Sequence, residues 1–275
     1  MRVSGAGVWG LLVWVICLSV GAVSAAPTAQ LWERWAVHDP ASAATVDHAQ
    51  WQAFLDINLR PSADGVNRIA YASVSDLDHA MLNNYIETLS AVSISAYQRA
   101  DQLAYWINLY NALTVKVVLD NYPVSSILKI STSLFSIGPW GEKRVQVEGE
   151  SLSLDDIEHR ILRPIWQDSR VHYAVNCASI GCPNLRTAAF VPGDLDSTLT
   201  LAAREYINSR RGVRIENGKL FVSSIYAWFA EDFGGTDEQV IAHIKVFADA
   251  DLNEQLSTLT QISDDFYDWD LNEPR

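Results

Sequence analysis

The sequence predicts an α+β fold, a single domain of helices packed on short antiparallel hairpins. Three observations predict it. Several segments repeat apolar residues at helical spacing, shorter alternating segments flank turn residues, and the two kinds are interspersed without a regular β–α alternation. The chain has 275 residues, 49% of them hydrophobic, so it can bury a sizeable core. We expect one domain over residues 51–272, preceded by a signal peptide at residues 1–25 and an N-terminal arm at residues 26–50.

Residues 1–25 are typical of a secretory signal peptide. Arg2 is the only charged residue before Glu33, and an apolar run and the small residues Val23-Ser24-Ala25 follow it. The apolar run is shorter than the roughly 20 residues that span a membrane. We therefore expect cleavage after Ala25, no stable membrane insertion once the signal is removed, and a periplasmic or secreted protein. Disulfides persist in such a compartment.

The formal net charge of −13 narrows the class of partner. An acidic surface repels the phosphates of nucleic acids and anionic lipid, so both are disfavoured. We expect no nucleic acid as partner and a small-molecule or peptide ligand instead. The sequence does not decide the oligomeric state.

The N-terminal arm and the first predicted helix carry simple signals. Trp32 and Trp35 are expected to dock the arm on the domain. Ser75 can cap a helix through Asp78, three residues further on, and apolar residues then recur at helical spacing as far as Leu89.

A second helix is predicted from about Ala96 to Asp120. Its centre is apolar on all sides except for two asparagines, Asn108 and Asn111, and a helix of that kind is buried all round. The two amides lie three residues apart and share one face. They either tie the helix to a neighbouring loop or line a polar pocket.

The second half of the chain alternates hairpins, helices and loops. Ser153 caps a helix expected over 154–162 and ended by Pro164, and Val171–Val175 is expected to be a buried strand that leads into a loop with two cysteines. The other predicted elements are a hairpin of 144–147 with 150–152, a helix over 194–208, a hairpin of 213–216 with 219–222 around Asn217-Gly218, and a helix from Thr236 to about Phe247. The aromatic segment 266–272 is expected to pack back on the domain.

Several separated motifs resemble one known family. They are Tyr105–Leu113, Leu152–His159, Arg170–Cys177 with Cys182-Pro183, Ser223–Phe233 and Tyr267–Asn272. Together they resemble the family called domain of unknown function 547, over most of residues 50–272. The resemblance implies no settled activity. The order of a buried helix followed by a His-bearing segment is also similar to papain-like and transglutaminase-like folds, which is an analogy of fold alone.

Cys177 and Cys182 leave three interpretations open. A disulfide would close a loop of four residues and stabilise the fold by about 2 kcal/mol. Alternatively, one thiol is reactive because a neighbouring group lowers its pKa, or both are inert and buried. His172 precedes Cys177 by five residues, so on a strand their side chains would point to opposite faces, and a bend would be needed to bring them together.

The candidate site residues follow from these motifs. We take Cys177 as the candidate nucleophile and His172 as the candidate base. The candidate substrate-binding residues are Asn108, Asn111, Glu158, Arg170, Asn176, Cys182 and Trp228. Glu231 and Asp232 sit among aromatic residues. Either a carboxylate here is buried with Arg170 or Arg186 as its partner, or it is a surface acid, and the sequence leaves both open. Two cysteines and one histidine do not complete a tetrahedral set of ligands, so we expect no metal and no cofactor.

Two functions from different classes remain. The first is a thiol/His-dependent hydrolase or acyl-transfer enzyme that acts on a small peptide, amide or thiol-containing ligand. The second is a non-enzymatic periplasmic ligand-binding or interaction domain, in which Cys177 and Cys182 form a disulfide and an aromatic cleft holds the ligand.

Overall fold

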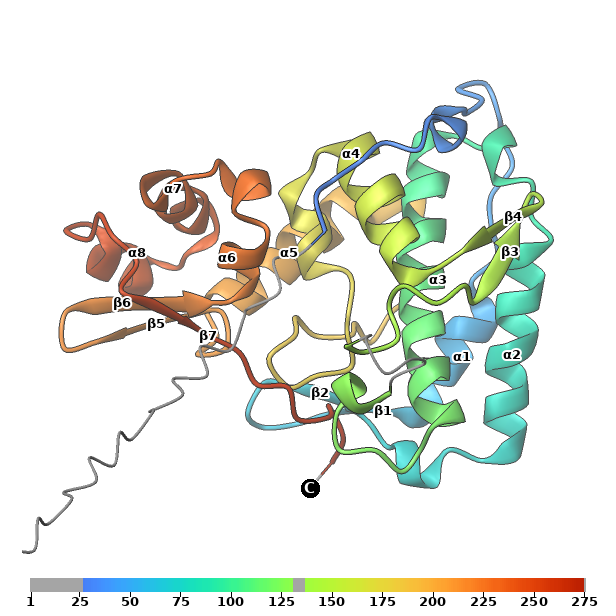
Figure 1. The fold of residues 1–275 in the computed structure, drawn as a ribbon, viewed down its shortest axis with the longest axis horizontal. Coiled ribbons are helices and arrows are strands. Elements are labelled where there is room, and N and C mark those ends of the chain that lie inside the picture. The colour runs from blue at the N-terminus through green and yellow to red at the C-terminus, as the bar shows by residue number, and fades with distance from the viewer. Residues whose placement is uncertain (1–26, 131–136, 275) are drawn as a thin grey trace, which may run out of the picture.

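The computed structural model describes residues 27–130 and 137–274, so the predicted signal peptide lies outside the described residues. The α-helices are α1 Ala49–Asn58, α2 Asp76–Ser90, α3 Arg99–Asp120, α4 Arg163–Trp166, α5 Leu195–Ile207, α6 Ile225–Trp228, α7 Asp237–Phe247 and α8 Ala250–Leu256. The strands are β1 Leu59–Pro61, β2 Asn67–Ile69, β3 Val145–Val147, β4 Glu150–Leu152, β5 Val213–Glu216, β6 Lys219–Ser223 and β7 Asp264–Phe266. The α+β prediction is confirmed (Figure 1).

Helix α3 runs through the larger half of the molecule beside α2 and behind the hairpin of β3 and β4 (Figure 1). Seventeen of its residues are buried, including Asn108 and Asn111. The predicted all-round burial is therefore confirmed, with the helix beginning at Arg99. Helix α2 begins as predicted, because the Ser75 hydroxyl accepts a hydrogen bond from the backbone N–H of Asp78 at 3.1 Å.

The strands form three small sheets. Strands β1 and β2 pair antiparallel, as do β3 and β4, and the third sheet has the order β5-β6-β7. Strand β7 runs parallel to β6, with Phe221 opposite Asp264, so this sheet is not the purely antiparallel hairpin that was expected. Since β7 leads directly into 267–272, this pairing brings the aromatic C-terminal segment back onto the domain, as predicted.

The helix that begins after Ser153 does not end at Pro164. A π-helical stretch, Asp156–Leu162, continues directly into α4, and Gln167 ends the helix with a φ of 51°. Proline has no N–H, so carbonyls one turn earlier lose their helical partner. In this chain the carbonyls of His159 and Arg160 accept instead from the backbone N–H groups of Gln30 and Trp32, at 2.9 and 3.0 Å. The N-terminal arm thus satisfies the groups that Pro164 leaves free.

The strand expected over 171–175 is a 3₁₀ helix, Ser169–Tyr173. The Asp168 carboxylate accepts from the backbone N–H of Arg170 at 2.9 Å, and its carbonyl accepts from Val171 at 3.0 Å. The side chain of Asp168 therefore caps a helical turn. The alternation of apolar residues that predicted a strand here does not outweigh this cap. The rule that spacing of five separates His172 and Cys177 onto opposite faces does not apply here.

The apolar interior has two parts. The larger core gathers side chains from α1, α2, α3, the β3–β4 hairpin and the helix after Ser153. The smaller core gathers side chains from the second half of α5, from β5 and β6, and from α7. In the part of the chain that the structure describes, no helix combines the length and the apolar character needed to cross a membrane.

Candidate functional site

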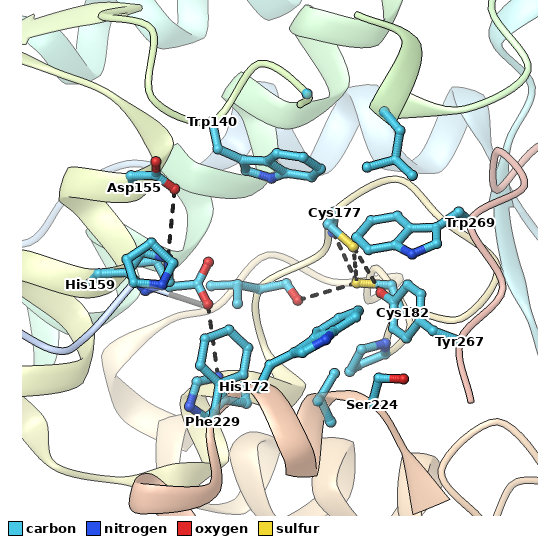
Figure 2. A pocket seen from close by; sticks show the side chains of 18 of the residues that line it. Trp140, Asp155, His159, His172, Cys177, Cys182, Ser224, Phe229, Tyr267 and Trp269 are labelled. Atoms are coloured by element: carbon cyan, nitrogen blue, oxygen red, sulfur yellow. Dashed lines mark hydrogen bonds and ion pairs between the residues drawn. The ribbon is translucent and has the colours of Figure 1, made fainter. Parts of the chain in front are cut away.

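A cavity of about 770 Å³ lies where the two cores meet, and aromatic rings form much of its wall. Figure 2 shows the two cysteines on one side of it and the His159 and His172 side chains on the other. The aromatic residues that line it are Tyr110, Trp140, Trp228, Phe229, Phe266, Tyr267 and Trp269. The ionisable residues that line it are Asp155, Glu158, His159, His172, Cys177, Cys182 and Asp265, with Tyr110 and Tyr267.

The sulfur of Cys177 lies among three polar groups. It is 2.9 Å from the sulfur of Cys182, 3.0 Å from the hydroxyl of Tyr267 and 3.2 Å from the hydroxyl of Ser179. Both cysteines are free thiols. When Cys177 is protonated, its S–H donates to Cys182; when it is ionised, it accepts hydrogen bonds from these neighbours.

These neighbours make the two thiols different. Burial alone would raise the pKa of Cys177, but hydrogen bonds from Cys182, Ser179 and Tyr267 outweigh it and lower the pKa. Burial raises the pKa of Cys182, and the negative charge of an ionised Cys177 raises it further. Cys177 is therefore the thiol of the pair that ionises first, and the ionised form is the nucleophile.

The loop that carries Cys177 is fixed from α3. The Asn111 amide donates to the carbonyl of Ala174 at 2.9 Å and accepts from the N–H of Asn176 at 2.8 Å. The Asn176 amide donates to the carbonyl of Pro183 at 2.7 Å and accepts from the N–H of Ala178. Ala178 has a φ of 57°. This backbone conformation is energetically unfavourable for a residue that has a side chain, and the surrounding contacts hold it in place.

Gly181 lets the C-terminal segment approach this loop. A Cβ atom at this position would lie 2.7 Å from the backbone nitrogen of Asp268 and 2.9 Å from its carbonyl oxygen. The backbone N–H of Gly181 also donates to the Asp268 carbonyl at 2.8 Å. Only glycine allows this close packing, and the packing places Tyr267 against the sulfur of Cys177.

His172 lies on the other side of the cavity between two carboxylates. Its Nε2 is 2.6 Å from Asp232, and its Nδ1 is 3.8 Å from Glu158. The ring is buried and stacks on Phe229, with 4.3 Å between the ring centroids. Asp232 also accepts from Nε of Arg163 at 2.6 Å. Burial disfavours the charged carboxylate, but the hydrogen bonds from His172 and Arg163 prevail and hold the pKa of Asp232 below its ordinary value.

Asp155 and His159 form a second polar pair beside this one. Arg163 donates to Nδ1 of His159 at 3.1 Å, so the ring proton sits on Nε2, which faces Asp155 at 3.6 Å. Burial lowers the pKa of His159. Burial, with the charges of Glu158 and Asp156, raises the pKa of Asp155 to about 6. This pair can hold or release a proton near neutral pH.

Five of the nine residues predicted from the sequence line the cavity: His172, Cys177, Glu158, Cys182 and Trp228.

The other four do not line the cavity, and the substrate-binding roles expected for them stay predictions. Asn108 and Asn111 serve backbone groups of two loops, since Asn108 exchanges both its hydrogen bonds with Phe190. The Asn176 side chain makes its hydrogen bonds within the cysteine loop, to Pro183 and Ala178. Arg170 pairs with Asp168 and Asp196, because the 3₁₀ turn directs it away from the cavity.

The sequence left a direct pair of Cys177 and His172 open, and the structure does not form one. Among the described residues, no hydrogen bond joins them, because the 3₁₀ turn points the imidazole at Asp232 while the sulfur faces Tyr267. The expected partners of Asp232 are corrected as well. Its cation is Arg163, and Arg186 pairs with Glu205 instead.

Sequence reasoning missed Arg163, Asp155 and Tyr267 as members of the site. Arg163 precedes a proline that was expected to end the helix, and Asp155 was explained by the helix dipole. Tyr267 was noted only as part of an aromatic segment. The motif match of Leu152–His159 and Tyr267–Asn272 was the signal that could have found the last two.

No group of three or more His, Cys, Asp or Glu side chains within residues 27–130 and 137–274 is arranged to hold a metal ion. The expectations of no metal and no cofactor stay predictions.

Comparison with known proteins gives one match. No curated protein and no solved structure matches the chain, so the likeness to papain-like and transglutaminase-like folds stays a prediction, as do the domain bounds 51–272. The matched segment, residues 94–207, carries α3, the π-helix and both cysteines. These residues match the model of the family described as "Protein of unknown function, DUF547", which supports the resemblance that the sequence motifs indicated.

Proposed function

We propose that this protein is a thiol-dependent hydrolase or acyl-transfer enzyme, acting in the periplasm or outside the cell on a small peptide, amide or thiol-containing ligand. The observation that carries the proposal is the position of the Cys177 sulfur. It lies on the wall of a large aromatic cavity, within hydrogen-bond distance of Cys182, Tyr267 and Ser179. Donors of this kind stabilise a thiolate where a substrate can reach it.

The reaction we propose has two steps. The Cys177 thiolate attacks an acyl carbon, a bond from sulfur to carbon forms, the bond to the leaving group breaks, and the leaving group takes a proton from His172. Water or a second nucleophile then attacks the thioester carbon, gives a proton back to His172, and releases the Cys177 thiolate. His172 thus exchanges protons with substrate and water, and Asp232 orients its ring.

The hydroxyl of Tyr267 has a role in the first step. It lies 3.0 Å from the Cys177 sulfur and 3.0 Å from the Ser179 hydroxyl. The Tyr267 proton can go to the thiolate, and the single Ser179 proton goes either to the tyrosine oxygen or to the sulfur. A hydrogen bond to a charged group contributes about 1.5–3 kcal/mol, so losing this one should raise the pKa of Cys177 by about one unit or more.

The test has two measurements on the same protein. The rate at which iodoacetamide alkylates Cys177, followed by mass spectrometry across pH, should have its midpoint below the value of an ordinary thiol. Tyr267→Phe should move the midpoint up by about one pH unit, whereas Tyr97→Phe, at a residue that does not line the cavity, should leave it unchanged. p-Nitrophenyl acetate should place one acetyl group on Cys177.

Three results would overturn the proposal. The first is a Cys177–Cys182 disulfide in the native, active protein. The second is an alkylation midpoint that Tyr267→Phe does not move. The third is acetylation and turnover that persist in Cys177→Ala.

The alternative of a binding domain is favoured by the contact of three tryptophans around the cavity, with Trp228 and Trp269 stacked at 5.5 Å and Trp140 and Trp269 at 5.9 Å. It predicts that Cys177→Ala binds the ligand as well as the natural chain does and that neither protein turns it over.

A further inference from the structure

We propose that the cavity recognises a primary or secondary ammonium group on its ligand, held by Glu158 and Asp155 under the aromatic wall. This proposal rests on the proposed function in taking the cavity as the substrate site, and it names the class of substrate. The three observations that carry it are the rings of the wall, the sign of the charges around them, and one oxygen of Glu158.

The aromatic side chains that line the cavity contact one another. Trp228 contacts Tyr267 with 4.8 Å between centroids and stacks on Trp269 at 5.5 Å. Trp140 meets Trp269 edge-on at 5.9 Å, so contacts through Trp269 join the three tryptophans. The face of an indole attracts a cation by about 0.5–2 kcal/mol, more strongly than phenol or phenyl rings do. Such a wall accepts aliphatic, aromatic and cationic groups alike.

The charged residues that line the cavity favour a cationic ligand. Asp155, Glu158 and Asp265 line the cavity, and no lysine or arginine does among the described residues. The cationic groups beside the cavity are paired with carboxylates, because Arg163 contacts Asp232 and Lys143 contacts Asp156. His172, when protonated, lies between Asp232 and Glu158. Carboxylates in a cavity with low-dielectric walls attract cations and repel anions.

One oxygen of Glu158 has room for a donor. The residue is 7% exposed, and its Oε2 accepts from the hydroxyl of Tyr110 at 2.8 Å. Its Oε1 is 3.8 Å from Nδ1 of His172, beyond hydrogen-bond distance, and no other described residue donates to it. Glu158 lines the cavity, so this oxygen can accept a hydrogen bond from a ligand there. A ligand ammonium with at least one N–H supplies that donor, whereas a quaternary ammonium does not.

The experiment uses three probes that share a phenyl group and differ in charge: 2-phenylethylamine, 2-phenylethanol and 3-phenylpropanoate. Calorimetry at pH 7.5 would measure their affinity for the full chain and for Cys177→Ala, which prevents covalent reaction. We expect the amine to bind at least tenfold more tightly than the alcohol and the carboxylate to bind weakest. Glu158→Gln should remove most of the difference between amine and alcohol, since the amide has no charge.

Two further variants keep the test decisive. Glu254→Gln makes the same change on the exposed face of α8 and should leave the preference intact. Asp155→Asn, at a partly exposed position, should reduce it if Glu158→Gln fails to fold. Equal affinity for amine and alcohol, or a preference that survives both cavity substitutions, would overturn the proposal.

The outcomes also separate this inference from the proposed function. If the protein prefers the amine but Cys177 never accepts an acetyl group, the proposed enzyme activity is refuted and the proposed ammonium site is retained. Acetylation of Cys177 without any charge preference would do the reverse.

Discussion

Asn111 should be the residue through which α3 controls the reactivity of Cys177. We consider Asn111→Leu, which removes the amide and keeps the side chain close to its original volume. The amide makes two hydrogen bonds to backbone groups of the cysteine loop, at 2.9 and 2.8 Å, and the residue is 1% exposed. The control is Asn108→Leu, because Asn108 is 0% exposed and also makes two hydrogen bonds, but to Phe190.

The magnitude follows from the groups left without a partner. Each substitution leaves one buried N–H and one buried carbonyl unpaired, and each such group costs about 1–3 kcal/mol. The free energy of unfolding should therefore fall by about 2–6 kcal/mol in both variants, with no large cavity to add to it. Only Asn111→Leu releases the loop between Ala174 and Asn176, so only this variant should move Cys177 away from Tyr267.

The assay combines urea unfolding with thiol alkylation. Both variants should lose similar stability, and Asn111→Leu alone should raise the pH midpoint for alkylation of Cys177 in the folded protein. A loss below about 1 kcal/mol in both variants would refute the hydrogen-bond argument, because that is less than one unpaired buried group costs. An equal change of thiol reactivity in Asn108→Leu would refute the assignment of Asn111 to the site.

Two further predictions concern the close packing at Gly181 and the carboxyl of Asp155. Gly181→Ala should cost about 1–3 kcal/mol of stability and slow the alkylation of Cys177, because the new methyl group would press on the backbone of Asp268. Gly193→Ala, with open space around it, should change neither the stability nor the alkylation rate. A Gly181→Ala protein with unchanged stability and alkylation rate would contradict the packing argument. For Asp155, burial and the charges of Glu158 and Asp156, partly offset by Lys143, raise the pKa to about 6, so its negative charge appears as the pH rises through 6. The affinity for 2-phenylethylamine should accordingly rise about fivefold from pH 5 to pH 7, an effect of about 1 kcal/mol for a partly exposed ion pair. Burial lowers the pKa of the neighbouring His159, which disfavours its positive charge. Asp155→Asn should flatten the profile, and a profile as steep in that variant would assign the titration to another group.

The sequence was sufficient where a short segment determines its own structure. Asn217 and Gly218 adopt φ of 51° and 71°, and they form the turn that joins β5 and β6 as predicted. Thr236 accepts from the backbone N–H of Gln239 and begins α7. In each case the signal and the structure it produces lie within four residues of one another.

The sequence was insufficient where distant segments meet. Arg163 and Asp232 are 69 residues apart, and Cys177 and Tyr267 are 90 apart. No periodicity relates such positions, and a buried carboxylate can pair with any cation that the fold brings near. The continuation of the helix through Pro164 is of the same kind, since the compensating N–H groups come from Gln30 and Trp32.

The pairing of β7 with β6 implies an order of events during synthesis. The sulfur of Cys177 and its neighbour Cys182 leave the ribosome long before Tyr267, and Tyr267 reaches them only once β7 has joined the sheet. Until then the nascent chain carries a thiol without its phenolic neighbour, less ionised and slower to react with electrophiles. The rate of Cys177 labelling would therefore report when β7 pairs with β6 during folding.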